Sequence, residues 1–99
     1  LMLVSAGMAA AYAAKGVRVN AVNPGLTLTA RLQEGMKADA KLQGIDTDEA
    51  LKRATARLPL GRIATPEEIA TTVVFLASPR ASYVTGATVA MDGAVTPMI

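Results

Sequence analysis

The segment Val17–Thr29 constrains the fold more than any other, because a strand pattern ends abruptly inside it. A run rich in β-branched residues, with Val17, Val19 and Val22, predicts a short strand. The run stops at Pro24, which holds φ near about −65° and lacks an N–H donor. Gly25 follows, and a glycine permits positive φ and a close approach of other groups to the backbone. The segment therefore predicts a strand that ends in a turn.

Two threonines follow this turn, and each offers a hydroxyl and a backbone amide. In an open α/β sheet, ligands bind beyond the carboxyl ends of the strands, where they would meet Thr27 and Thr29. The residues alone also support a structural role, because Thr29 is well placed to cap the helix expected after it. On the residues alone, capping is the favoured interpretation.

The composition is unusually apolar for a short chain. Of 99 residues, 52% are hydrophobic, and the mean hydropathy is +0.35. A chain of this length buries only about 60–65% of its unfolded surface, so we expect that part of its core is formed with residues outside it. No segment reaches the roughly 18 uninterrupted apolar residues of a membrane span, so no membrane helix is expected.

Charge and residue types exclude several classes of function. Ten Lys and Arg are scattered among eight Asp and Glu, the net charge is +2, and only 3% of residues are aromatic. Nucleic-acid binding is therefore not expected. The absence of Cys and His excludes disulfides and the commonest metal ligands, so no metal site is expected. No secretory signal is visible, and we expect a cytoplasmic protein.

Periodicity and helix-ending residues predict the remaining elements. These are a helix over Leu1–Lys15 ended by Gly16, two short helices over Ala30–Leu42 and from Asp46 to about Arg57, a helix from Pro66 to Ser78, and a strand over Ala87–Met91. Strand, helices and strand in this order form a crossover that is parallel in nearly all cases. Two parallel strands are too few to be stable alone, and one edge of the first strand would be bare.

Four blocks of sequence, in order, resemble the C-terminal part of a short-chain dehydrogenase/reductase. They are R-V-N-A-V-N-P-G (18–25), L-G-R-I-A-T-P-E-E-I-A (60–70), F-L-A-S (75–78) and V-T-G-A-T-V-A-M-D-G-A (84–94). The chain is most similar to the bacterial branch often labelled 3-oxoacyl-[acyl-carrier-protein] reductase. The resemblance implies an α/β fold in which residues 1–99 form the C-terminal part of a Rossmann-like doubly wound parallel sheet.

Within that fold, the resemblance implies the order helix, strand, helical lid, helix, strand. Residues 26–60 would form the substrate lid, and the N-terminal cofactor-binding half would lie outside this sequence. From the residues alone, the two helices of this segment could equally be a solvated link between the two strands. The resemblance favours the lid, which would order or close over cofactor and substrate.

The resemblance also implies a function and a cofactor site. The family transfers hydride between NAD or NADP and a carbonyl or alcohol. By the match to P-G-x-x-x-T, Pro24 and Gly25 would shape the pocket floor, Thr27 would offer backbone groups to the nicotinamide carboxamide, and Thr29 would offer its hydroxyl. The family often has a branched apolar residue where Thr27 stands, but a backbone contact tolerates the threonine. The residues that separate NAD from NADP would lie upstream.

Tyr12 and Lys15 are of the same residue types as the family's catalytic tyrosine and lysine, but their spacing and position do not match that pair. That pair is separated by three residues, whereas only two lie between Tyr12 and Lys15, and they stand at the wrong end of their helix beside Gly16. Aligned on G-V-R-V-N, the family's lysine would fall about three residues before Leu1. No catalytic residue is therefore assigned within this chain, and the tyrosine and lysine that perform acid–base catalysis are expected upstream.

The sequence also leads to expectations about the substrate and about association with other chains. The Leu, Met and Ala residues of the lid fit many apolar or acyl groups, so a small carbonyl, alcohol or acyl substrate is expected. The family forms homo-oligomers, and the apolar residues around Val89 and Met91 would meet a second subunit in a dimer or tetramer. Two alternatives remain: a non-catalytic piece that only associates with copies of itself or a full-length subunit, and a lid segment with no independent fold.

Overall fold

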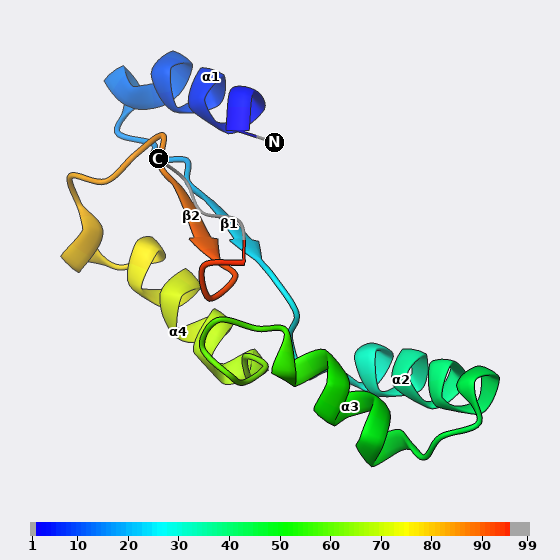
Figure 1. Cartoon of the computed structure of the whole chain (residues 1–99). Helices are drawn as coiled ribbons and strands as arrows, with labels where there is room; N and C mark the ends of the chain where they lie inside the picture. The colour runs from blue at the N-terminus through cyan, green and yellow to red at the C-terminus, as the bar shows by residue number, and fades with distance from the viewer. Residues whose placement is uncertain (1, 96–99) are drawn as a thin grey trace. The chain divides into compact units, whose positions relative to one another are not determined.

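The computed structural model describes residues 2–95, which form helices and a small sheet (Figure 1). The elements in chain order are α1 (Met2–Tyr12), a 3-10 helix (Ala13–Lys15), β1 (Ala21–Pro24), α2 (Ala30–Gln43), α3 (Thr47–Ala56), α4 (Pro66–Ala77), a 3-10 helix (Pro79–Ala81) and β2 (Thr88–Met91). The contacts divide the chain into two compact units. One comprises the residues up to Pro24 with Glu67–Met91, and the other comprises Gly25–Pro66 with the residues from Asp92 onward.

The first unit contains the sheet, in which β1 and β2 run side by side in the same direction (Figure 1). Ala21 pairs with Thr88 at one end and Pro24 pairs with Met91 at the other. The predicted parallel pairing is confirmed. β1 ends at Pro24 as expected, because proline has no N–H with which to continue the ladder.

The start of β1 was predicted too early. The expected strand began at Val17, whereas regular pairing begins only at Ala21. Before that point the backbone bonds to a turn instead: the N–H of Val19 donates to Thr85 Oγ1 at 3.1 Å, and Gly86 donates its N–H to the Val19 carbonyl at 2.7 Å. The Thr85 side chain takes the place of a backbone partner for Val19, so the β-branched composition alone overestimated the length of the strand.

Two polar side chains tie the residues before β1 to this turn and to α4. The Arg18 guanidinium donates to three carbonyl oxygens, those of Leu76 at 2.7 Å, Val84 at 3.2 Å and Ser78 at 3.3 Å. Asn20 also donates to the Val84 carbonyl, and its own Oδ1 accepts from the N–H of Ala87. These bonds join segments about sixty residues apart in the sequence.

The predicted helix Leu1–Lys15 is divided in the structure, and Leu1 lies outside the described residues. α1 ends at Tyr12, and a single 3-10 turn continues to Lys15. Gly16 then ends the segment in the left-handed conformation, with φ of 76°, and donates its N–H to the Ala13 carbonyl. The glycine therefore has the helix-ending role that the sequence predicted.

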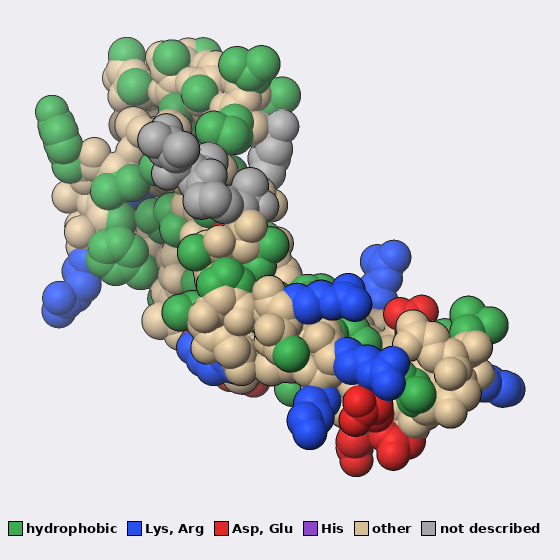
Figure 2. All heavy atoms as spheres, viewed as in Figure 1, with side chains coloured by type: hydrophobic (Ala, Val, Ile, Leu, Met, Phe, Trp, Pro, Cys, Tyr) green, Lys and Arg blue, Asp and Glu red, His purple; other side chains and the backbone are tan. Residues whose placement is uncertain are grey.

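The buried part of the structure is small. All five buried hydrophobic residues among those described are alanines, and no large side chain is fully buried. Large apolar side chains instead remain on the surface, as Leu3 at 90% exposed and Val74 at 67% exposed illustrate. Figure 2 shows hydrophobic side chains on the visible face of α1. The excess of apolar surface expected from composition is thus observed.

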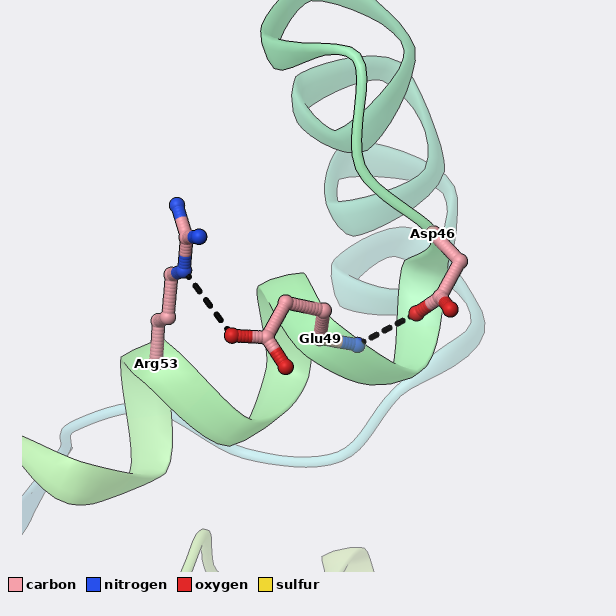
Figure 3. Close-up of polar contacts among 3 residues, drawn as sticks. All are labelled: Asp46, Glu49 and Arg53. Carbon is pink, nitrogen blue, oxygen red and sulfur yellow. Dashed lines mark hydrogen bonds and ion pairs between the residues drawn. The ribbon is translucent and has the colours of Figure 1, made fainter.

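The second unit is organised by a pair of helices. α2 and α3 pack against each other and are joined at Gly44, which ends α2 with φ of 68°. Asp46 begins α3 by accepting the N–H of Glu49 on its Oδ1 at 2.7 Å, and Glu49 in turn accepts from Arg53 Nε at 3.1 Å (Figure 3). Both helices were predicted, with ends that lie within one residue of those observed. Charged side chains gather over this pair (Figure 2).

α4 begins at Pro66 as predicted, because a proline at the first helical position loses no hydrogen bond. It ends at Ala77, one residue earlier than expected. Ser78 instead caps the short helix that starts at Pro79, accepting the N–H of Arg80 at 3.3 Å. Among residues 2–95, no helix is long and apolar enough to cross a membrane.

Candidate functional site

The structure brings three of the four predicted cofactor-contacting residues together. Gly25, Thr27 and Thr29 line one open hollow of about 430 Å³ in the second unit. The other wall of this hollow is the first half of α2, through Arg31, Leu32, Gly35, Met36 and Asp39, with Leu26 beside the glycine. Pro24 belongs to the first unit, where it is the last residue of β1.

Gly25 is required by a close backbone approach. A Cβ placed on it would lie 2.9 Å from the Cβ and 3.0 Å from the Cα of Asp92, distances at which one of the two segments must move. Positive φ plays no part, since Gly25 is not among the glycines with that conformation. Of the two properties that the sequence suggested, the structure uses only the absence of a side chain.

The backbone of Thr27 is fixed by a bridge to Ala64, and its own N–H and C=O point away from Ala64. It forms a parallel bridge with Ala64, in which Leu28 donates to the Ala64 carbonyl at 2.8 Å and Ala64 donates to the Leu26 carbonyl at 3.3 Å. In such a bridge the central residue directs its N–H and C=O to the opposite side. The Thr27 carbonyl accepts from Thr29 at 2.8 Å, while within residues 2–95 its N–H has no partner.

Thr29 caps α2, as the favoured interpretation of the residues predicted. Its backbone is extended, with φ of −104° and ψ of 167°, and its Oγ1 accepts the N–H of Leu32 at 3.1 Å. The side chain is exposed, and a hydroxyl that accepts one bond can still donate its own proton. Capping and a ligand contact are therefore compatible in one residue.

The groups offered here match a primary carboxamide, which is the recognisable polar group of nicotinamide. The carboxamide oxygen needs donors, and the Thr27 N–H and Thr29 hydroxyl are two donors on one hollow. The Thr27 carbonyl has a second lone pair for the carboxamide NH₂. The residues present thus fit the cofactor group that the sequence implied. Among residues 2–95, no cluster of His, Cys, Asp or Glu could hold a metal ion.

Tyr12 and Lys15 lie in contact with each other at the end of α1. Lys15 Nζ is 5.8 Å from the centre of the Tyr12 ring, within cation–π range, and both residues are exposed. At an exposed site such a contact contributes about 0.5–1 kcal/mol. This contact supplies a structural role for the pair, and their exclusion from catalysis stays a prediction.

Comparison with known proteins identifies the family. The family model described as enoyl-(acyl carrier protein) reductase matches residues 1–96. A crystal structure of a short chain dehydrogenase family protein from Francisella tularensis superposes with a TM-score of 0.91 at 36% identity, covering 96% of this chain and 39% of that one.

The chain belongs to the short-chain dehydrogenase/reductase family. The predicted α/β fold class, the C-terminal part of a Rossmann-like parallel sheet, is thereby confirmed. The L-sorbose reductase of Gluconobacter frateurii, solved with NADPH and L-sorbose, matches with a TM-score of 0.92 at 35% identity over 100% of this chain and 38% of its own. The 2-(S)-hydroxypropyl-CoM dehydrogenase 3 of Xanthobacter autotrophicus is 46% identical over 90 residues, which are 90% of this chain and 33% of that protein.

The chain therefore spans between 33% and 39% of the length of these three relatives. Arg31 also lines the hollow, in the first turn of α2, and no role was predicted for it. The sequence did contain a sign of such a role, because a cation in the first turn of a helix is unfavourable beside the positive end of the helix dipole. Only the folded structure places it on the same hollow as Thr27 and Thr29.

Proposed function

We propose that this chain is part of an NAD(P)-dependent oxidoreductase that transfers hydride between the nicotinamide ring and a carbonyl or alcohol substrate. The observation that carries the proposal is the hollow on which Gly25, Thr27 and Thr29 meet. Membership of the short-chain dehydrogenase/reductase family supports it, as does the NADPH bound to the related L-sorbose reductase.

A nicotinamide bound here would supply or accept the hydride, and the residues of this chain would orient it. The Thr27 N–H and the Thr29 hydroxyl would donate to the carboxamide oxygen and so hold that group in place. Gly25, at one end of the hollow, leaves room for Asp92, because any larger residue would collide with it. Pro24, the residue before Gly25, ends β1. The proton that accompanies hydride transfer is handled by a tyrosine and a lysine outside these residues.

The substrate is a small carbonyl or alcohol compound. The names of two relatives support this class, since one is a dehydrogenase of a hydroxypropyl compound and the other reduces L-sorbose, a keto sugar. Residues 26–60 form the lid over this substrate, with α2 and α3 as its helices. An acyl substrate of the 3-oxoacyl type belongs to the same chemistry, because its 3-oxo group is reduced to an alcohol.

A second proposal concerns assembly and rests on the exposed apolar side chains of the first unit. Leu3, Val4 and Val74 are 90%, 64% and 67% exposed, and both outer edges of the two-stranded sheet lack partners among the described residues. Such surfaces are covered by the remainder of the domain and by a second subunit, giving a dimer or tetramer. A non-catalytic association module has the same surfaces but no turnover.

The test uses the protein expressed from the whole reading frame that encodes this chain, called here the whole gene product. Purified protein is assayed with NADH and NADPH against a panel of small ketones and secondary alcohols. The proposal predicts saturable cofactor oxidation or reduction that depends on both substrates. Cofactor binding is measured separately by the change in nicotinamide fluorescence. Assembly without binding or turnover would instead support the association module.

A further inference from the structure

The hollow beside Thr27 and Thr29 contains a cation that the proposed cofactor contacts leave unused. Arg31 lines the hollow from the first turn of the 14-residue helix α2. In the part of the chain that the structure describes, its guanidinium has no hydrogen bond or ion pair. A positive charge in the first turn is also unfavourable beside the positive end of the helix dipole. The arrangement leaves an unbalanced positive charge on the hollow.

Gly35 lies one turn further along the same face of α2 and keeps the hollow open. A glycine in a helix interior is less stable than an alanine. A Cβ built on Gly35 would meet nothing within 4 Å, so no described neighbour requires the glycine. Because Gly35 has no side chain, the surface of α2 next to Arg31 stays open to the hollow.

The negative charge on this hollow lies far from Arg31. Asp39 is two turns along α2, and eight residues of helix rise about 12 Å. The side chains between these charges, Leu32 and Met36, are apolar and half-buried. Among the residues that line the hollow, the positive charge therefore lies next to the two threonines, the middle is apolar and open, and the negative charge lies at the far end.

We propose that Arg31 makes this site select substrates that carry an oxyanion group, such as a carboxylate, sulfonate or phosphate. The inference rests on the proposed function and names the substrate class for it. A guanidinium presents paired N–H donors that match such groups in two parallel hydrogen bonds. The oxyanion occupies the Arg31 end of the hollow, and the body of the substrate lies over Gly35. The phosphates of the cofactor have similar chemistry, so the test must separate the two sources.

The test compares acids with their esters, because esterification removes the charge and keeps the carbon skeleton. The whole gene product is assayed for reduction of acetoacetate and methyl acetoacetate, and of longer 3-oxo acids and their methyl esters. Wild-type protein is expected to prefer the acids in kcat/KM. Arg31→Gln should lower kcat/KM for the acids about tenfold to hundredfold, with less than twofold change for the esters. Arg31→Lys should recover part of the loss.

Three further measurements keep the result specific. Arg57→Gln is the matched control, because it removes an exposed arginine of the same unit that does not line the hollow. Gly35→Leu fills the open space with a good helix former and should raise the KM of the bulkier substrates while leaving the unfolding transition intact. Acetoacetate binding, measured by saturation-transfer NMR, should weaken in Arg31→Gln without any dependence on turnover.

The opposing outcomes are distinct. Equal losses for acids and esters, or a rise in the KM of the cofactor alone, would overturn the assignment and place Arg31 on the cofactor phosphates. Turnover of esters without any preference for acids in the wild type would also overturn it, while the proposed function would stand. Failure of the wild type to reduce any acid or ester, with turnover of other ketones or alcohols of the panel, would overturn the assignment of Arg31 and leave the proposed function standing. Absence of turnover on the whole panel with either cofactor, together with absence of cofactor binding, would overturn both.

Discussion

Arg18 donates a hydrogen bond of 2.7 Å to the carbonyl oxygen of Leu76, near the end of α4 and 58 residues away in the sequence. The same guanidinium reaches the carbonyls of Ser78 and Val84. The last carbonyls of a helix have no partner within it, and the cation also complements the negative end of the helix dipole. One side chain therefore holds together the approach to β1, the end of α4 and the turn before β2.

Removal of the Arg18 guanidinium should lower the stability of the protein substantially. Arg18→Gln leaves three carbonyls without their charged donor, and we expect the free energy of unfolding of the whole gene product to fall by about 2–4 kcal/mol. Arg18→Lys should recover less than half, because a single ammonium cannot span three carbonyls. Urea denaturation followed by circular dichroism measures both. Arg57→Gln is the control and should change the free energy of unfolding by less than about 0.5 kcal/mol. If Arg18→Gln changed it no more than this control does, Arg18 would not hold these segments together.

The two proposed roles of Thr29 can be separated by substitution. Thr29→Asp keeps a capping acceptor but has no hydrogen to donate, so stability should be retained while the KM of the cofactor rises about three- to tenfold. Thr29→Val should lose both the cap and the donor, and Thr29→Ser should lose neither. Steady-state kinetics and thermal unfolding of the three variants give the two readouts. A cofactor KM that is unchanged in Thr29→Asp would leave Thr29 as a cap alone.

Gly25 and Gly35 form a matched pair, because only one of them has a close neighbour. Gly25→Ala would bring a Cβ to 2.9 Å from Asp92 Cβ, so we expect a loss of about 1–3 kcal/mol and a raised cofactor KM. Gly35→Ala meets nothing within 4 Å and should stabilise α2 by up to about 1 kcal/mol. Chemical denaturation tests the opposite signs. A stable Gly25→Ala protein would mean that the segment around Asp92 moves freely.

Asp46 should contribute more to stability than the ion pair next to it. Asp46→Ala removes the acceptor for the Glu49 N–H at the start of α3, at an expected cost of about 1 kcal/mol, whereas Asp46→Asn should cost little. Arg53→Gln breaks an exposed pair and should cost about 0.3–0.5 kcal/mol. High salt should abolish only the second effect, which thermal unfolding at two ionic strengths would reveal.

The 99 residues alone should not unfold cooperatively. Their buried hydrophobic residues are all alanines, and burial of so little apolar surface cannot offset the loss of chain entropy. Circular dichroism in a denaturant titration, together with NADH and NADPH fluorescence, tests this expectation. A sharp transition with micromolar cofactor affinity would contradict it and would mean that these residues are a domain in their own right.

Local signals in the sequence predicted most of the secondary structure. Gly16 and Gly44 mark the ends of helical segments, Asp46 and Thr29 mark helix starts, and Pro66 begins α4, all as their side-chain chemistry requires. The misplaced start of β1 has a tertiary cause. Nothing within residues 17–20 reveals that a threonine hydroxyl and a glycine amide more than sixty residues away will take up the hydrogen bonds of Val19.

The sequence by itself determined the family, the parallel crossover and the residues of the turn after β1, because these depend on local patterns and on motifs that keep their order. Only the tertiary structure decided what those residues face. The Ala64 bridge turns the N–H of Thr27 outward, Asp92 requires the glycine at position 25, and the fold of the second unit brings Arg31 to the hollow beside the threonines. Such relationships join groups distant in the chain, and no local pattern encodes a contact between them.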